Sequence, residues 1–483
     1  MKQLGKTLLW IWILILVSLN SWSMFNGKTQ SERSINFKAK ERPNLVLVLV
    51  DDLGYADVGF NGCKDIPTPN IDRIADQGVI FTNGYVTWAA CGPSRAGIIT
   101  GRYQDRFGFG RNPLFAPNDP EMGLPLSEET LPDVLKKANY KSVAIGKWHL
   151  GAHESLRPLK RGFDDFYGFL SGGHQYFPEK WTLADEYAAK SQGGGYRTKL
   201  LRNDERIDET EYLTDALSRE AVNYIEKYKD ASFFMYLAYN APHGPLQATE
   251  KYLTRFNHIK DIKRRTYAAM VSAVDDGVGL VLDKLESLNL SKNTIVVFLS
   301  DNGGPERGHG SDNGSLRGTK GHLLEGGIRV PFAMMWPSKI KPKTVYDNPI
   351  ISLDIFSTII AQGEKSIETK NPIDGVNLIP YISGDKEGLP HERLFWRTYD
   401  KEDYAIREGE YKLVQNSEEE GVFNLQNDLS EENDLQKKLP NKYDLLKERY
   451  EEWQKQMKPP IFMGLKQNSE YNKTHPKRFV KSN

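Results

Sequence analysis

Polar side chains that can bind a cation or move a proton follow four apolar segments of this 483-residue chain. The four sets are, in chain order, Asp51-Asp52 after residues 45–50, Lys147 and His149 after 142–145, His243 after 233–238, and Asp301-Asn302 after 294–299. A single Asp or His after a strand is ordinary loop polarity, whereas four such sets indicate one shared site. Carboxylate and amide oxygens suit Ca²⁺ or Mg²⁺ rather than Zn²⁺, and an all-oxygen set with little water favours Ca²⁺.

The elements that must position these residues are predicted to be buried strands that alternate with helices. The four runs are apolar on both faces, which is typical of parallel strands covered on both sides. Amphipathic helical patterns lie between them, at residues 69–77, 130–138, 212–228 and 266–288. We therefore predict an α/β fold with a large, mixed but mostly parallel sheet sandwiched by helices. In such sheets ligands bind beyond the carboxyl ends of the strands, where the four polar sets lie.

The character of the chain changes near residue 386. Short apolar runs separated by turn residues occupy 404–425, and a charged amphipathic helix is predicted over 443–457. We predict a larger domain over 43–385, which carries the polar sets, and a small α+β domain with an antiparallel sheet over 386–465. Residues 466–483 are predicted to be a loosely held polar tail.

The first residues are predicted to direct export. Residues 1–23 have the lysine-containing start, apolar run and small residues of a cleaved secretory signal, and residues 24–42 are predicted to be a flexible leader. A retained membrane anchor is the alternative. We favour cleavage and expect a periplasmic or secreted protein with no stable membrane anchor. Lys plus Arg equals Asp plus Glu, at 64 each, so the net charge of zero argues against a nucleic-acid partner.

The chain has two cysteines, Cys63 and Cys91, and in an exported protein they could form a disulfide. Cys91 begins the segment Cys-Gly-Pro-Ser-Arg, which resembles the signature of type I sulfatases. Further motifs of that family follow the same order over most of residues 43–425. They are Asp51-Asp52, Gly-Lys-Trp-His at 146–149, Ala-Pro-His at 241–243, Asp-Asn-Gly-Gly at 301–304 and Arg-Gly-Thr-Lys-Gly at 317–321. The chain is therefore identified as a member of this alkaline-phosphatase-like family.

The resemblance implies a specific chemistry. A maturation enzyme would oxidise Cys91 to formylglycine, which rules out the disulfide, and the hydrated aldehyde at the start of a helix over 92–99 would attack sulfur to give a sulfo-enzyme intermediate. One Ca²⁺ would be held by residue 91 together with Asp51, Asp52, Asp301 and Asn302. The remaining roles implied by the family are stabilisation of the ionised diol by Arg95 and Lys147, proton removal by His149, and action on the sulfate and leaving oxygen by His243 and Lys320.

The segment over 162–177 resembles that of sulfatases that act on carbohydrates. The implied substrate is a sulfate ester on an extracellular polysaccharide. Algal galactans, ulvan and glycosaminoglycans are the candidates, and we favour a marine algal polymer. The candidate sugar contacts are His153, Arg157, His174, Arg317 and His322. A formylglycine-dependent phosphonate monoester or phosphodiester hydrolase and a non-catalytic glycan-binding relative are the competing functions. The second predicts loss of Cys91, Arg95, Lys147 or His243, and all four are present.

Overall fold

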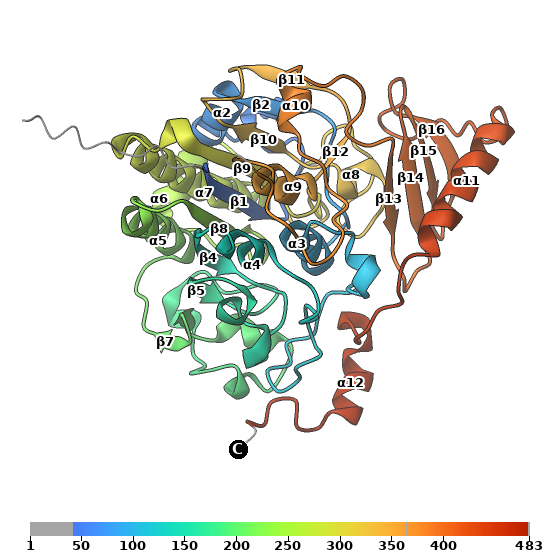
Figure 1. Cartoon of the computed structure of the whole chain (residues 1–483). Coiled ribbons are helices and arrows are strands. Elements are labelled where there is room, and N and C mark those ends of the chain that lie inside the picture. The colour runs from blue at the N-terminus through green and yellow to red at the C-terminus, as the bar shows by residue number, and fades with distance from the viewer. Residues whose placement is uncertain (1–41, 364, 482–483) are drawn as a thin grey trace, which may run out of the picture. The chain divides into compact units, whose positions relative to one another are not determined.

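A ten-stranded mixed sheet lies at the centre of the structure, a computed structural model that describes residues 42–363 and 365–481 (Figure 1). The predicted signal segment and residues 24–41 of the leader lie outside these residues. The strand order is β11 (Thr344–Tyr346), β2 (Val79–Phe81), β10 (Phe332–Met335), β9 (Thr294–Ser300), β1 (Asn44–Asp51), β8 (Phe233–Pro242), β4 (Lys141–Lys147), β5 (Asp165–Phe169), β6 (Leu200–Arg202) and β7 (Glu205–Ile207). The five strands from β9 to β5 are mutually parallel, and β10, β6 and β7 pair antiparallel with their neighbours. The predicted mostly parallel sheet is confirmed.

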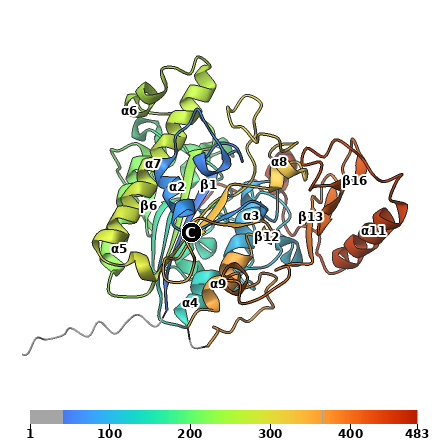
Figure 2. The same ribbon diagram turned by 90° about the horizontal axis from the view of Figure 1, so that it is seen from above.

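Both faces of the central strands are covered by helices, which explains why their sequences are apolar throughout. Alternate side chains of a strand point to opposite faces. In β1, Leu45, Leu47 and Leu49 therefore join one core, whereas Val46, Val48 and Val50 join the other. The first core includes α3 (Cys91–Thr100), α4 (Leu131–Lys136) and α9 (Asp354–Ile360), and the second includes α2 (Pro69–Asp76), α5 (Leu213–Tyr228) and α7 (Ile262–Ser287). Figure 2 shows these two groups of helices on either side of β1.

The predicted helices are present, and their ends follow local capping. Thr130 caps α4: its hydroxyl pairs with Asp133, whose carboxylate accepts from the Thr130 amide at 3.0 Å. Helix α7 begins at Ile262, four residues before the predicted start, because the Asp261 carboxylate accepts a hydrogen bond of 2.7 Å from the Arg264 amide. Lys263, Arg264 and Arg265 in this first turn concealed the start of the apolar pattern.

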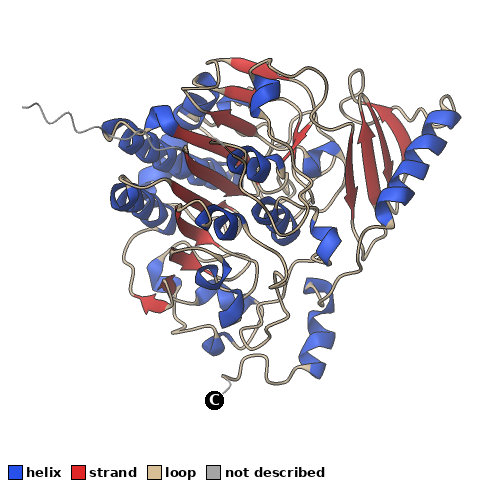
Figure 3. Ribbon diagram, in the orientation of Figure 1, coloured by secondary structure: helices blue, strands red, loops and turns tan. Residues whose placement is uncertain are grey.

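The C-terminal part forms the predicted antiparallel sheet, which has four strands (Figure 3). It consists of β13 (Arg393–Arg397), β14 (Tyr404–Glu408), β15 (Tyr411–Gln415) and β16 (Glu420–Asn424), with α11 (Pro440–Gln454) packed against it. Its core is continuous with Tyr85 and Tyr103 of the larger part, and a domain boundary near residue 385 stays a prediction.

The expected loose tail after residue 466 is instead ordered in the structure. Residues Asn468–Thr474 form α12, in which Tyr471 is buried. Arg478 is 3% exposed and donates hydrogen bonds to the Phe115 carbonyl at 2.9 Å and to Asn472 at 2.8 Å. Two buried side chains, Tyr471 and Arg478, therefore hold this segment to the protein, while most of its polar residues are exposed. Among the described residues, none of the helices combines the length and apolar character that crossing a bilayer requires.

Candidate active site

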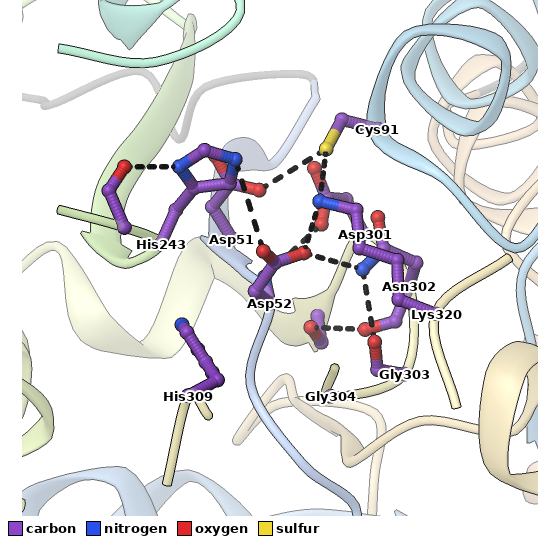
Figure 4. Close-up of polar contacts among 12 residues, drawn as sticks. Asp51, Asp52, Cys91, His243, Asp301, Asn302, Gly303, Gly304, His309 and Lys320 are labelled. Atoms are coloured by element: carbon purple, nitrogen blue, oxygen red, sulfur yellow. Dashed lines mark hydrogen bonds and ion pairs between the residues drawn. The ribbon is translucent and has the colours of Figure 1, made fainter. Parts of the chain in front are cut away.

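The carboxyl ends of four adjacent parallel strands meet at one site, in the order β9, β1, β8 and β4. Figure 4 shows part of this site, where Asp52 lies between His243 and Lys320. The structure brings together the residues predicted for catalysis and for metal binding, which are Asp51, Asp52, Cys91, Arg95, Lys147, His149, His243, Asp301, Asn302 and Lys320. Most are fully buried.

The strand ends approach closely at Gly146. A Cβ atom there would lie 2.0 Å from the Ala238 carbonyl oxygen, and its φ of +98° is in the left-handed region that favours glycine. This glycine therefore allows β4 to run against β8 up to Lys147, whose ammonium forms an ion pair with Asp51 of β1. The next turn holds His149 at a φ of +57°, with its ring against Gly172.

Cys91 is the first residue of α3 and is 2% exposed. Its Sγ lies 3.3 Å from Asp51 Oδ1 and 3.2 Å from Lys320 Nζ. Asn112 Oδ1 accepts a hydrogen bond of 2.8 Å from the Gly92 amide, which fixes the first turn. Burial and the nearby Asp51 carboxylate raise the pKa of the thiol to about 12, so the encoded cysteine is protonated at neutral pH and is a poor nucleophile.

The structure does not contain the disulfide that two cysteines allow. Both thiols are free, and Cys63 Sγ lies 3.3 Å from Asp65 Oδ1 in a loop.

The acidic residues form a cluster with the dimensions of a cation site. Asp51, Asp52, Cys91 and Asp301 each offer one ligand atom, and these atoms all lie within 4.8 Å of one another. A Ca²⁺–oxygen distance of about 2.4 Å fits an ion among atoms spaced in this way. The Oδ1 atom of Asn302 is buried with no hydrogen-bond partner among the described residues, while its Nδ2 donates to Asp52 Oδ1 at 2.7 Å. The Asn302 Oδ1 atom can accept a hydrogen bond or bind a cation, and it lies beside the acidic cluster, so the residues present fit a hard divalent cation.

The cationic side chains of Arg95, Lys147 and Lys320 form ion pairs with the carboxylates of Asp301, Asp51 and Asp52, respectively. Arg95 Nε donates to Asp301 Oδ2 at 2.8 Å, and Lys320 Nζ donates to Asp52 Oδ1 at 2.6 Å. Burial alone would raise the pKa of Asp52, but Lys320 and the neighbouring histidines hold it well below its usual value. Burial likewise opposes the charge on Lys320, yet Asp52 and the other acidic groups keep its pKa well above the usual value. Lys320 therefore stays protonated at neutral pH and places a positive charge beside Cys91.

The two predicted histidines are buried beside these cations. Burial lowers the pKa of His243 to about 3, against the opposing effect of Asp52, and lowers that of His149 well below its usual value. His243 Nδ1 lies 2.6 Å from the Gly244 carbonyl oxygen, and its Nε2 lies 3.8 Å from Asp52 Oδ2. Since a carbonyl only accepts, Nδ1 carries the proton and Nε2 faces the site. His149 Nδ1 is buried with no hydrogen-bond partner among the described residues.

The five predicted sugar contacts do not form one group. His174 is fully buried, and its ring nitrogens lie 2.9 and 2.8 Å from the carbonyls of Gln175 and Thr198, so it supports a loop. Arg157 forms an ion pair with the buried Glu186. The other three are placed as follows: Arg317 pairs with Glu419 at 2.9 Å, His153 is half-buried with Nδ1 2.8 Å from Ser155 Oγ, and His322 is exposed two residues after Lys320.

Sequence reasoning missed several residues that contact the site. Asn112 holds the start of α3, and the Tyr176 hydroxyl donates to the His243 carbonyl at 2.7 Å. The Tyr196 ring packs edge-on against the His243 ring at a centroid distance of 6.5 Å. No motif marks these positions. His309 also lies near Asp52 (Figure 4), and its Gly-His-Gly setting in the loop after Asp301 was the available signal.

Known proteins share both the sequence and the fold. A family model described as Sulfatase matches residues 43–363, and one described as N-sulphoglucosamine sulphohydrolase, C-terminal, matches residues 319–459. The uncharacterized sulfatase YdeN of Escherichia coli (strain K12) is 31% identical over 446 residues, which cover 80% of this chain and 75% of that protein. Human N-acetylgalactosamine-6-sulfatase is 34% identical over 357 residues, covering 71% of this chain and 66% of the human protein.

The crystal structure of Ps i-CgsB in complex with k-i-k-neocarrahexaose is also similar. It superposes with a TM-score of 0.83 and 37% sequence identity, covering 91% of this chain and 100% of that one. The family model spans well over half of the chain, and the relatives match over most of its length. This protein therefore belongs to the sulfatase family and is a sulfuric ester hydrolase.

Proposed function

We propose that this protein removes sulfate esters from a carbohydrate by means of a formylglycine formed from Cys91. The position of Cys91 carries the proposal: it begins the ten-residue helix α3 beside Asp51 and Lys320. The positive end of a helix dipole and a lysine ammonium both favour an anion, as a sulfate ester is. The thiol itself is held protonated, so the residue needs to be modified before it can act as a nucleophile.

The buried carboxylates would hold one Ca²⁺. Formylglycine supplies an aldehyde hydrate with two hydroxyl groups, and a bound Ca²⁺ polarises the oxygens that it contacts. Asp51, Asp52 and Asp301 would contact the ion through carboxylate oxygens, and Asn302 through its unpartnered Oδ1. A hard oxygen set without clustered histidine nitrogen is the reason to expect Ca²⁺.

The surrounding side chains divide into two groups by their contacts. Lys147 and Arg95 bracket Asp51, with Arg95 Nη2 3.8 Å from its Oδ2, and their charges would stabilise an ionised oxygen on residue 91. The buried His149 would accept the proton from the second hydroxyl. Lys320 and His243 contact different oxygens of Asp52. Lys320 would bind the sulfate through its ammonium, and the negative charge of the bound sulfate would favour protonation of His243 Nε2, which would then deliver that proton to the leaving oxygen.

The substrate proposed is a sulfated algal galactan of the carrageenan type or its oligosaccharides. Support comes from the related structure that holds k-i-k-neocarrahexaose and from relatives named for the 6-sulfate of N-acetylgalactosamine. The exposed His322, in the same loop as Lys320, is the best placed of the predicted sugar contacts. The N-terminal signal predicted over residues 1–23 would deliver the enzyme to such a polymer outside the cytoplasm, and a formylglycine-generating enzyme is its expected maturation partner.

The test is turnover by protein produced together with a formylglycine-generating enzyme. Carrageenan oligosaccharides, ulvan oligosaccharides and glycosaminoglycan disaccharides are compared by ion chromatography of the released sulfate. We expect the carrageenan oligosaccharides to be desulfated fastest. Faster hydrolysis of an aryl phosphodiester than of the matching aryl sulfate would overturn the proposed reaction.

A further inference from the structure

A cleft of about 310 Å³ opens beside Cys91, between loops of the larger part and the C-terminal part of the chain. Ala90, Asn112 and Lys320 line the end next to the catalytic site. Ala90 directly precedes Cys91, and Lys320 Nζ lies 3.2 Å from Cys91 Sγ. A molecule whose sulfate ester lies at residue 91 therefore has direct access to this cleft.

The cleft also carries positive charge that the carboxylates of the protein pair only in part. Arg111 also lines the cleft, but Asp400 pairs with it, with Nε and Oδ1 3.0 Å apart. Lys401 is 41% exposed, and its Nζ donates to the Gly321 carbonyl at 3.4 Å and lies 4.0 Å from Asp403 Oδ2, so a carboxylate holds it only loosely. Lys466 is exposed and has no ion-pair partner within the described part of the chain. Lys466 and the loosely paired Lys401 can thus bind an anion, although the chain as a whole is neutral.

The remaining lining of the cleft suits a sugar ring. The half-buried Trp88 lines the cleft, and its Nε1 donates to the Arg397 carbonyl at 2.7 Å, which fixes the indole ring. Leu465 adds a second apolar side chain, 47% exposed, and Gly321 and Gly464 leave the walls without bulky groups. Sugar sites commonly combine an amphipathic aromatic ring with a few charged groups that fix orientation.

We infer that this cleft binds the neighbouring sugar of the same chain through a second sulfate ester, which Lys401 and Lys466 contact. The inference rests on the proposed function, because it takes the reacting sulfate to lie at residue 91. It narrows the substrate class to oligosaccharides that are sulfated on adjacent sugars. Lys401 and Lys466 both belong to the C-terminal part of the chain. This part would therefore determine which substrate binds, while the larger part performs the chemistry.

The test compares oligosaccharides of equal length that carry the same cleavable sulfate. One has a second sulfate on the neighbouring sugar, one has a hydroxyl there, and one has a uronate carboxylate. We expect the doubly sulfated oligosaccharide to have the highest kcat/KM, through a lower KM. Lys401→Ala and Lys466→Ala should each reduce this preference about fivefold, and the preference should shrink as salt is added.

The matched control is Lys473→Ala, which removes an exposed lysine of α12 outside the cleft and should leave the preference unchanged. Equal kcat/KM for the sulfated and unsulfated neighbours, or lysine variants that keep the full preference, would overturn the inference. A preference for the uronate would overturn the assignment to sulfate.

Calorimetric binding to the Cys91→Ser protein separates this inference from the proposed reaction. If the protein does not perform the proposed reaction, no oligosaccharide is desulfated, yet the lysine substitutions still weaken binding of the doubly sulfated oligosaccharide. If the cleft is wrong, desulfation continues with no preference for a second sulfate.

Discussion

Replacing Lys412 by methionine would leave the buried carboxylates of Glu325 and Glu431 without their shared lysine. Lys412 is fully buried, and its Nζ lies 2.8 Å from Glu325 Oε1 and 2.9 Å from Glu431 Oε1. Methionine retains most of the aliphatic chain, so the change removes mainly the charge. Because the remaining carboxylates stay buried, the expected loss is larger than that from an exposed ion pair.

The magnitude follows from what remains around each carboxylate. Removing one partner of a buried ion pair costs about 3–5 kcal/mol. Glu325 keeps two other partners, the Tyr85 hydroxyl at 2.6 Å and Arg329 Nη1 at 3.4 Å. Burial raises the pKa of Glu431 to about 7, so this group can take up a proton instead of holding an unpaired charge. The expected loss is therefore near the lower end, about 3 kcal/mol.

The loss is measured by urea unfolding at pH 7.5, followed by tryptophan fluorescence. Adding Glu431→Gln to Lys412→Met should recover much of the stability, because one buried charge is removed with its partner. Lys455→Met is the control: that lysine is 75% exposed, lies 3.8 Å from Glu452, and should cost less than about 1 kcal/mol. A loss below about 1 kcal/mol for Lys412→Met, or no recovery in the double variant, would refute the reasoning.

The same substitution should lower sulfatase activity. Glu325 begins the short helix α8 (Glu325–Ile328), whose Gly326 amide donates to the Arg317 carbonyl at 2.8 Å. The Gly327 carbonyl accepts from Gly303, directly after Asn302, at 3.0 Å. Movement of α8 would therefore displace both the Lys320 loop and the end of β9, which Asp301 and Asn302 follow.

Three further predictions concern pH, metal and geometry. Burial raises the folded-state pKa of Glu431 from 4.5 to about 7, so its contribution to stability is full below about pH 4.5 and is lost as the pH rises through 7. The urea midpoint of the Glu431→Gln protein should therefore fall less than that of the wild type over this pH range. Ca²⁺ at about 100 times its dissociation constant should stabilise the wild type by about 2.7 kcal/mol, and Asp301→Asn should abolish most of the shift in melting temperature. Gly172→Ala would place a Cβ atom 2.6 Å from His149 Nε2, so kcat should fall at least about tenfold with an unchanged circular dichroism spectrum; an unchanged kcat would remove His149 from the mechanism.

The pattern of apolar runs ending in polar residues was enough to predict the parallel strands and the site at their ends. Such runs are buried on both faces, and the order of β9, β1, β8 and β4 brings their ends together. β13 was missed because arginines at both of its ends, Arg393 and Arg397, hide a short apolar centre.

The sequence could not show which predicted sugar contacts are paired within the protein, because residue type does not reveal what a side chain pairs with. His174 and His149 look alike in the sequence, yet His174 is enclosed by Phe169 and Trp181 with both nitrogens occupied. Arg157 and Arg317 are likewise paired with glutamates. The cleft beside Cys91 joins segments near residues 88, 111, 400 and 465, a proximity that only the folded chain shows.

Cys91 is proposed to act only after its conversion to formylglycine. The most direct measurement follows sulfate release from a carrageenan oligosaccharide by protein whose intact mass is recorded in the same sample. We predict that release rises with the fraction of protein lighter by about 18 Da, persists in Cys63→Ser and is lost in Cys91→Ser. Undiminished release by Cys91→Ser, or none from fully converted protein, would contradict the account.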